Sequence, residues 1–230
     1  SKKHLKLLGA KNIKYIGNLK FTELETNKDT ISKKLKKKFL SKKIWCASST
    51  HENEEKIVAQ VHIKLKRQNQ NILTIIIPRH INRVTGIIKM LQKLNLKVHM
   101  HGSQNKIDNN TDIYLVDIYG KTKMFYSICG TVFLGGSLIK HGGQNPLEAA
   151  RYGCQILHGP NIWNFDEIYQ LLNRSKVSHK VKNINQISEK ISLSFSNKKN
   201  TKHIKNKLNL LSNKILRLTL KEINYFIKKK

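Results

Sequence analysis

The sequence comprises 230 residues, of which 44 are Lys or Arg and 14 are Asp or Glu, so its formal net charge is +30 at pH 7. Its hydrophobic content of 39% is enough for the core of one ordinary domain or two small ones. Cys46, Cys129 and Cys154 show no C-x-x-C pairing, which argues against a disulfide framework and indicates buried, reduced thiols. No segment resembles a signal peptide, and the longest apolar runs are too short to cross a bilayer.

Short β-branched runs alternate with segments of helical periodicity through most of the chain. The predicted strands are Lys43–Ser49, Asn71–Pro78, Lys97–Gly102, Asp112–Ile118, Thr131–Gly136 and Gln155–Pro160. Most are apolar on both faces, as are strands that helices cover on either side. The alternation predicts an α/β fold with a doubly wound, Rossmann-like parallel sheet and right-handed crossovers.

Apolar residues at helical spacing predict the helices between these strands. In residues 27–43 the lysines lie on the exposed side, and Leu35, Phe39 and Leu40 are expected to face the core. The other two apolar faces consist of Ile57, Val58, Val61 and Leu65, and of Val84, Ile87, Ile88, Leu91 and Leu94.

After residue 197 the pattern changes to a long basic helical segment. Its apolar stripe is formed by Ile204, Leu208, Leu211, Ile215, Leu218 and Ile223. Such a stripe needs a partner, either the sheet of the same domain or another surface. We therefore expect a Rossmann-like lobe over residues 1–197 and a basic C-terminal helical segment over residues 198–230.

The stretch FLGGSLIKHGGQNPLEAARYG, residues 133–153, places two Gly-Gly pairs between a strand and a helix. Ligands of open parallel sheets bind beyond the carboxyl ends of the strands, where glycines let the main chain approach an anion. Asn145 and Pro146 suit the cap and first position of the helix, and Glu148 its third. Glu148 either closes a capping box or accepts hydrogen bonds from a ribose diol. Without a Walker or G-x-G-x-x-G motif, the residues alone indicate only a phosphate-bearing ligand of the nucleotide kind.

The stretch CASSTHENEE ends a predicted strand in small hydroxyl residues and begins a helix. Ser49 or Thr50 suits the helix cap, and the acidic Glu52, Glu54 and Glu55 suit its positive end. These residues either share the ligand of the glycine-rich stretch or only cap the helix.

The stretch IIIPRHINR closes the next strand with Pro78 and Arg79. An Arg at this position suits a phosphate or carboxylate because its planar guanidinium donates two hydrogen bonds at once; the alternative is a solvated surface side chain. HENEE is not H-E-x-x-H, and we expect neither a metal nor a cofactor.

The positive charge has two explanations. It is carried by Lys alongside abundant Asn and Ile, as an A/T-rich genome would impose on tolerant surface positions. Alternatively, it reflects a preference for anionic surfaces. Aromatic residues make up only 7% and do not interleave with the lysines, which argues against a nucleic-acid-binding module that stacks bases.

Together, ASSTHENEE, PRH, FLGGSLIKHGGQNPLEAARYG and GPNIWNF, in this order and spacing, resemble the C-terminal half of bacterial 3-deoxy-D-manno-octulosonic acid (Kdo) transferases. LGAKNIKYIGNLKF and ILRLTLKEI extend the resemblance to nearly the whole chain. It implies the C-terminal, nucleotide-sugar-binding lobe of a glycosyltransferase B (GT-B) fold. The implied reaction transfers Kdo with inversion from CMP-Kdo to a lipid A precursor in lipopolysaccharide biosynthesis.

The resemblance also implies partners and a location. These are the N-terminal lobe of the same enzyme, which carries the general base, and the anionic cytoplasmic face of the bacterial inner membrane, where the enzyme is peripheral. We nominate no catalytic base on this chain and expect no specific nucleic acid. The other interpretations left open are a nucleotide-sugar epimerase of the same two-lobed fold and a basic nucleic-acid-binding module.

Site residues are carried over by motif, and the full set is Ser49, Thr50, His51, Pro78, Arg79, Gly120, Gly136, Ser137, Gly142, Gly143, Gln144, Asn145 and Glu148. Ser49, Thr50 and His51 would border the cleft, and Pro78 and Arg79 would lie at the nucleotide. Gly136 and Ser137 would line the phosphate side near Asn145, and Glu148 would bind the ribose hydroxyls.

Two positions depart from the family pattern. Gln144 stands where the family has His, which keeps hydrogen bonding but removes titration near neutral pH. Gly120 precedes Lys121 where the family has Gly-Glu, which weakens the assignment of Gly120 as a nucleotide contact.

Overall fold

The computed structural model describes residues 2–22, 31–196 and 202–228. It divides into two compact units, one made of residues 1–26 with 206–230 and the other of residues 27–205. The predicted boundary between 1–197 and 198–230 stays a prediction, and the contacts group the first 26 residues with the C-terminal ones.

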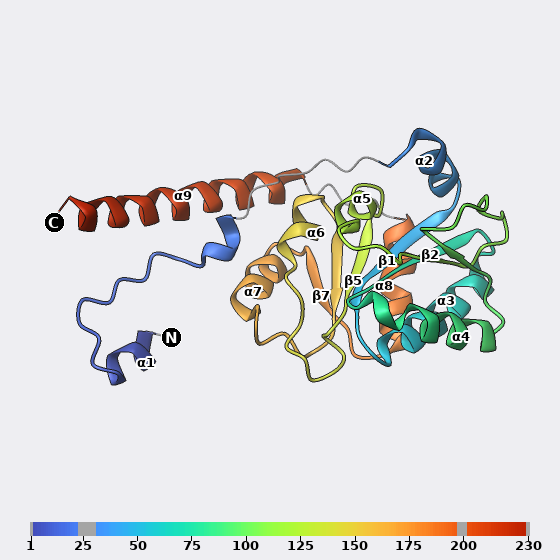
Figure 1. Ribbon diagram of the computed structural model, residues 1–230, viewed down its shortest axis with the longest axis horizontal. Coiled ribbons are helices and arrows are strands. Elements are labelled where there is room, and N and C mark those ends of the chain that lie inside the picture. The colour runs from blue at the N-terminus through green and yellow to red at the C-terminus, as the bar shows by residue number, and fades with distance from the viewer. Residues whose placement is uncertain (1, 23–30, 197–201, 229–230) are drawn as a thin grey trace. The chain divides into compact units, whose positions relative to one another are not determined.

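The larger unit is built on a sheet of seven strands. They are β1 (Lys43–Thr50), β2 (Ile72–Pro78), β3 (Val98–Met100), β4 (Ile113–Leu115), β5 (Thr131–Leu134), β6 (Gln155–His158) and β7 (Ser178–Lys180). All neighbouring strands are parallel, in the order β3-β4-β2-β1-β5-β6-β7. Figure 1 labels β1, β2, β5 and β7 of this sheet. The predicted doubly wound parallel sheet is confirmed. Strand β7 was not predicted, because three residues are too short for a periodicity to show.

The helices of this unit are α2 (Lys33–Leu40), α3 (Glu54–Gln68), α4 (Val84–Lys93), α5 (Thr122–Tyr126), α6 (Leu147–Arg151), α7 (Asp166–Arg174) and α8 (Ile184–Ser196). Apolar residues of α3, α4 and α8 pack in one cluster with Trp45, Ala47 and Phe133 of the sheet. The opposite face is covered differently: Tyr126 of α5 bonds to Ser48, and the ring of Tyr169 of α7 lies against His158. Because side chains alternate along a strand, β1 therefore meets helices on both faces.

Both predicted apolar faces are confirmed by that cluster, which contains Val58, Val61 and Leu65 of α3 and Ile87 and Leu91 of α4.

The basic helix predicted over residues 27–43 is shorter in the structure. Residues 27–30 lie outside the described ranges, and α2 begins after Ser32, whose hydroxyl accepts from Leu35 N at 3.3 Å. Phe39 is fully buried, with its ring edge on Tyr114. The expectation that Leu40 faces the core is wrong: this side chain is 57% exposed, because α2 contacts the sheet chiefly through Phe39.

All three cysteines are buried and free, as predicted. The Cys154 thiol donates to the carbonyl of Cys129 at 3.2 Å. Burial raises the pKa of Cys154, so this thiol stays protonated at neutral pH.

The smaller unit contains α1 (Lys2–Leu7), a 3-10 turn (Leu19–Thr22) and most of α9 (Lys202–Ile227). Gly17, at a φ of +139°, lies so close to Ile215 that a Cβ there would stand 2.8 Å from its side chain. Of the predicted stripe, Leu208 and Ile215 are buried, Ile223 is exposed, and the Ile204 side chain lies outside the described residues. Within the described ranges, every helix is too short or too polar to cross a membrane.

Candidate functional site

The order of the strands locates the site. Strands β1 and β5 are neighbours, and the chain continues from β1 to β2 on one side and from β5 to β6 on the other, so a crevice opens between the carboxyl ends of β1 and β5. Of the site residues predicted from the sequence, Ser49 and Thr50 end β1, Pro78 ends β2, and Gly136 closely follows β5. The fold therefore gathers at one edge of the sheet the segments that the sequence analysis singled out.

The end of β1 is irregular. The register with β2 shifts between Ser48 and Thr50, and Ser49 adopts a φ of +54° at this bulge. A side chain on Gly135 would lie 2.4 Å from the Ser49 carbonyl oxygen, so only glycine lets the loop after β5 approach β1 this closely. The Thr50 hydroxyl is buried and has no hydrogen-bond partner among the residues that the structure describes.

Glu54 connects this strand end to the glycine-rich loop. Its fully buried carboxylate accepts hydrogen bonds from four main-chain N–H groups: His51 at 3.0 Å, Gly136 at 2.7 Å, Ser137 at 3.1 Å and Leu138 at 3.0 Å. Burial raises the pKa of Glu54, and the four donors oppose that rise. The N–H groups of Gly136 and Ser137 are thus engaged by an internal carboxylate.

The cap predicted for the helix after β1 differs from the one in the structure. Helix α3 begins at Glu54 after Asn53, which has a left-handed φ of 70° and makes no capping bond through its side chain. Ser49 and Thr50 belong to β1 instead of capping α3, and Glu54 serves the loop beyond β5. The sequence placed Glu54 only in a negative first turn, because its loop partners lie more than 80 residues away.

Ser137 also has a structural role. Its hydroxyl donates to the Leu134 carbonyl at 2.5 Å and accepts from Gly159 N at 2.8 Å, and the residue is fully buried. Its carbonyl accepts from Asn161 N at 3.0 Å. Ser137 therefore joins the glycine-rich loop to the GPNIWNF segment that follows β6.

The side chains of Gln144 and His51 are hydrogen-bonded to each other in the site. The Gln144 Nε2 group donates to His51 Nε2 at 3.2 Å, and the Gln144 carbonyl accepts from the Tyr169 hydroxyl at 3.1 Å. Gly142 and Gly143 precede Gln144 with φ values of +97° and +79°, so this turn requires glycine at both positions. A Cβ on Gly142 would also lie 2.2 Å from the Asn164 side chain.

His51 lies in a group of histidines. Its ring centroid is 4.0 Å from that of His141 and 5.9 Å from that of His80. Burial, followed by the charges of these two rings and of Arg83 and Arg79, lowers the pKa of His51 to about 4. His51 is therefore neutral at pH 7 and accepts the Gln144 N–H. Among the described residues, no three His, Cys, Asp or Glu side chains are arranged to hold a metal ion.

Glu148 lies at the start of α6. The helix begins at Leu147, so Pro146 is the cap and Glu148 the second helical residue, one position earlier in the helix than predicted. The Asn145 side chain accepts from Leu147 N at 3.1 Å. Glu148 Oε1 lies 3.6 Å from Lys123 Nζ, and the Glu148 side chain is 32% exposed, so its carboxylate is accessible to a ligand.

Two arginines follow β2, and they differ in their surroundings. Arg83 forms a two-pronged pair with the buried Glu55, at 2.9 and 3.0 Å, which joins α3 to the turn before α4. Arg79 is exposed, and its main-chain N–H donates to the Thr50 carbonyl at 2.9 Å. Arg79 is therefore held at the crevice by its backbone and presents its guanidinium outward. Gly120, at a φ of +80°, lies in the exposed loop between β4 and α5.

A pH effect follows from His158, which ends β6 and is buried. Its Nδ1 donates to the Gly159 carbonyl at 2.7 Å, and burial lowers its pKa to about 4. Between pH 6.5 and 4 the unfolded chain binds a proton at this residue and the folded chain does not, so the free energy of unfolding falls as the pH falls. We expect His158 to contribute about 3 kcal/mol of that loss.

Urea unfolding at pH 7, 6, 5 and 4.5 checks this, with the change His158→Gln removing the titrating ring. The difference in stability between the two proteins should narrow steadily as the pH falls. If the difference in stability between the two proteins is the same at every pH, His158 does not cause the loss of stability.

Comparisons with known proteins bear on the family. No protein-family model matches the chain. It is 33% identical over 159 residues to the 3-deoxy-D-manno-octulosonic acid transferase of Haemophilus influenzae, covering 68% of this chain and 37% of the relative. It is also 33% identical over 178 residues to the enzyme of that name from Rickettsia bellii, covering 76% and 42%. The chain thus spans about two fifths of the length of these curated relatives.

Among solved structures, the fold matches the C-terminal CMP-Kdo binding domain of WaaA from Acinetobacter baumannii. The TM-score is 0.68 at 23% identity, covering 80% of this chain and 94% of that one. The predicted fold class, the C-terminal lobe of a GT-B glycosyltransferase, is confirmed by this likeness. By its sequence and fold, the chain belongs to the family of 3-deoxy-D-manno-octulosonic acid transferases, of which it represents the C-terminal lobe.

Proposed function

We propose that this chain binds CMP-Kdo as the donor lobe of a Kdo transferase of lipopolysaccharide biosynthesis. The observation that carries the proposal is the arrangement at the carboxyl end of β1, where Arg79 N donates to the Thr50 carbonyl and Gln144 bonds to His51. The chain after Gln144 runs through Asn145 directly to Glu148 at the start of α6. The site contains an exposed guanidinium, amides and a carboxylate. Together these suit the phosphate, the base and the ribose of a nucleotide.

Each group has a chemical role in this proposal. Glu148 accepts hydrogen bonds from the ribose hydroxyls, and Lys123 Nζ lies 3.6 Å from its carboxylate. Arg79 pairs with the phosphate, supported by the polar turn at Gly142–Asn145. Because the N–H groups of Gly136 and Ser137 donate to Glu54, these two residues shape the phosphate side without donating to it. His51 positions Gln144.

The remaining parts of the reaction lie outside this chain in the proposal. A general base on an N-terminal lobe activates the lipid A precursor, and Kdo is transferred with inversion of configuration. The exposed apolar residues of α9, among them Leu220, Tyr225 and Phe226, pack on that lobe. The +30 charge holds the enzyme peripherally at the anionic cytoplasmic face of the inner membrane, with each well-placed Lys contributing roughly 1 kcal/mol.

Calorimetric titration with cytidine monophosphate tests the donor site. We expect the unmodified chain to bind, and the change Glu148→Ala to weaken binding about tenfold or more because two charge-assisted hydrogen bonds are lost. The change Glu189→Ala, at an exposed position of α8, is the matched control and should bind as the unmodified chain does.

Three results would contradict the proposal: no heat with the unmodified chain, equal heats for Glu148→Ala and the control, or stronger binding of uridine monophosphate. The last would favour the epimerase interpretation.

A further inference from the structure

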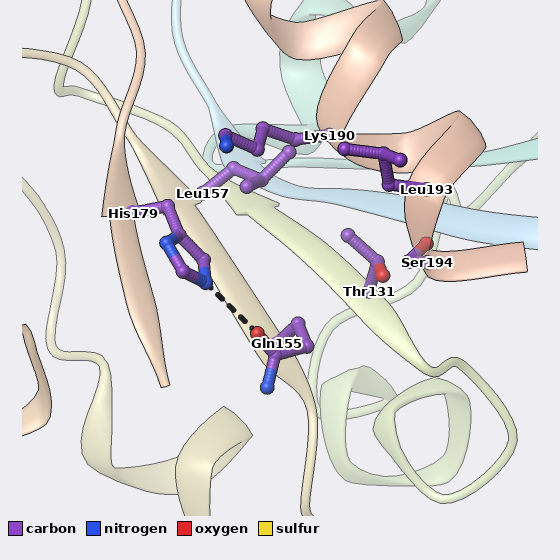
Figure 2. Close-up of a pocket in the computed structure, with 7 residues that line it drawn as sticks. All are labelled: Thr131, Gln155, Leu157, His179, Lys190, Leu193 and Ser194. Carbon is purple, nitrogen blue, oxygen red and sulfur yellow. Dashed lines mark hydrogen bonds between the residues drawn. The ribbon is translucent and has the colours of Figure 1, made fainter. Parts of the chain in front are cut away.

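A cavity lies at the opposite, amino edge of the sheet. It has a volume of about 180 Å³ and is lined by Thr131, Gln155, Leu157, His179, Lys190, Leu193 and Ser194 (Figure 2). Thr131 and Gln155 are the first residues of β5 and β6, and Lys190, Leu193 and Ser194 belong to α8. The cavity therefore lies between α8 and the beginnings of the strands and is partly open to solvent, at the end of the sheet away from the candidate nucleotide site.

Two polar atoms of the lining residues lack partners. Thr131 Oγ1 and Gln155 Nε2 are buried and form no hydrogen bond within the part of the chain that the structure describes. The residues are only 2% and 9% exposed. The Gln155 Oε1 atom accepts from His179 Nε2 at 3.0 Å, which leaves the amide N–H groups as the unused ones (Figure 2). Buried polar groups without partners are rare in folded proteins, and each one requires an explanation.

The unused groups and the charge of the lining favour an anion. The Gln155 amide and the Thr131 hydroxyl are hydrogen-bond donors, Lys190 supplies a positive charge, and none of the seven described lining residues is acidic. The walls are otherwise apolar, chiefly through Leu157 and Leu193. A ligand that fits both features carries an acceptor anion at one end and a hydrocarbon body at the other.

The size of the cavity limits the hydrocarbon body. A cavity of roughly 150 Å³ holds benzene, so about 180 Å³ accommodates a body of about six carbons. A neighbouring groove of about 450 Å³ shares Thr131, Gln155 and Ser194 with the cavity and also contacts Lys42 and Lys43. A longer chain would thus continue along further apolar surface next to these lysines.

We propose that this cavity is a binding site for a small aliphatic carboxylate. The carboxylate accepts hydrogen bonds from the Gln155 amide and the Thr131 hydroxyl and pairs with the Lys190 ammonium, while its chain lies against Leu157 and Leu193. The site is independent of the nucleotide site, because the two lie at opposite edges of the sheet and share no residue.

The test is an NMR titration of the whole chain with hexanoate, following the side-chain amide of Gln155 and the main-chain amides of Thr131 and Leu193. We expect saturable shifts centred on these residues. Hexanamide, which lacks the charge, and inorganic phosphate, which lacks the hydrocarbon chain, should each bind about tenfold more weakly or not at all. Prior saturation with cytidine monophosphate should leave hexanoate binding unchanged.

Two variants and a control make the test specific. Lys190→Met should weaken hexanoate binding about tenfold. Thr131→Val should also weaken it, and should raise the melting temperature of the ligand-free protein, because a methyl group replaces an unpaired buried hydroxyl. Lys182→Met changes an exposed lysine just before α8 and should bind hexanoate normally.

The proposal is overturned if hexanoate shifts no signal of this cavity at millimolar concentration, or if hexanamide binds as tightly as hexanoate. It is equally overturned if a crystal soaked with hexanoate contains only an ordered water molecule between Thr131 and Gln155. Failure of nucleotide binding in the calorimetric experiment would not affect these outcomes.

Discussion

Replacing Glu54 with Ala is expected to lower the free energy of unfolding by about 4 kcal/mol or more. The carboxylate accepts four main-chain hydrogen bonds within the core, from His51, Gly136, Ser137 and Leu138. Its removal leaves four buried donors without an acceptor, and each such group costs on the order of 1 kcal/mol or more. The loop beyond β5 would also lose the contact that holds it against the end of β1.

Urea unfolding monitored by circular dichroism measures this effect. Glu54→Gln retains one acceptor oxygen but turns an NH₂ group toward main-chain donors, so its loss should be smaller than that of the Ala variant. Glu52→Ala removes an exposed carboxylate two residues away and should change stability by less than about 0.5 kcal/mol. A loss below about 1 kcal/mol for Glu54→Ala would refute the role assigned to this residue.

Gly159→Ala is expected to destabilise the fold by about 3 kcal/mol, a large value for the addition of one methyl group. A Cβ at this position would stand 2.1 Å from the carbonyl oxygen and 2.3 Å from the carbonyl carbon of Ser137. Both are main-chain atoms, and no rotamer change can relieve the overlap. Relief would require the loop to move away, which would break the bond from Gly159 N to the Ser137 hydroxyl.

Gly130→Ala is the matched control, because a Cβ there meets no atom within 4 Å and the φ of Gly130 is not in the left-handed region. We expect its stability to stay the same or to rise slightly, since Ala restricts the unfolded chain more than Gly. Thermal and urea unfolding of the two variants, measured side by side, give the difference in their stabilities. Comparable stabilities for both would show that the contact between residues 137 and 159 is not tightly packed.

Much of the fold could be predicted from local patterns. A buried strand such as Ile72–Pro78 is apolar throughout, and the helix that follows β1 repeats its apolar residues at helical spacing, so element type and sheet class are encoded over short stretches. Helices α7 and α8 were not predicted, although both bury apolar residues at helical spacing. Strand β7 has three residues, and α2 proved shorter than its lysine-rich pattern suggested.

The candidate site was predicted less completely. The motifs identified the segments, and the fold brings Ser49, Arg79 and Gln144 to one edge of the sheet. Neither the bulge at Ser49 nor the bond between Gln144 and His51 is visible in the sequence, because both depend on how separate segments meet. The role of Glu54 was missed for the same reason, although its position in HENEE was noted.

The sequence by itself determined the parallel α/β architecture, the family, and the segments that form the candidate nucleotide site, because hydrophobic periodicity and glycine-rich motifs act over a few neighbouring residues. Only the tertiary structure decided which polar groups are already engaged. Glu54 takes the amides of Gly136 and Ser137, whereas Thr131 and Gln155 keep unused groups at the other edge of the sheet. Hydrogen-bond partners in a buried core come from residues distant in the chain, and their pairing depends on distances that exist only once the strands and loops have assembled.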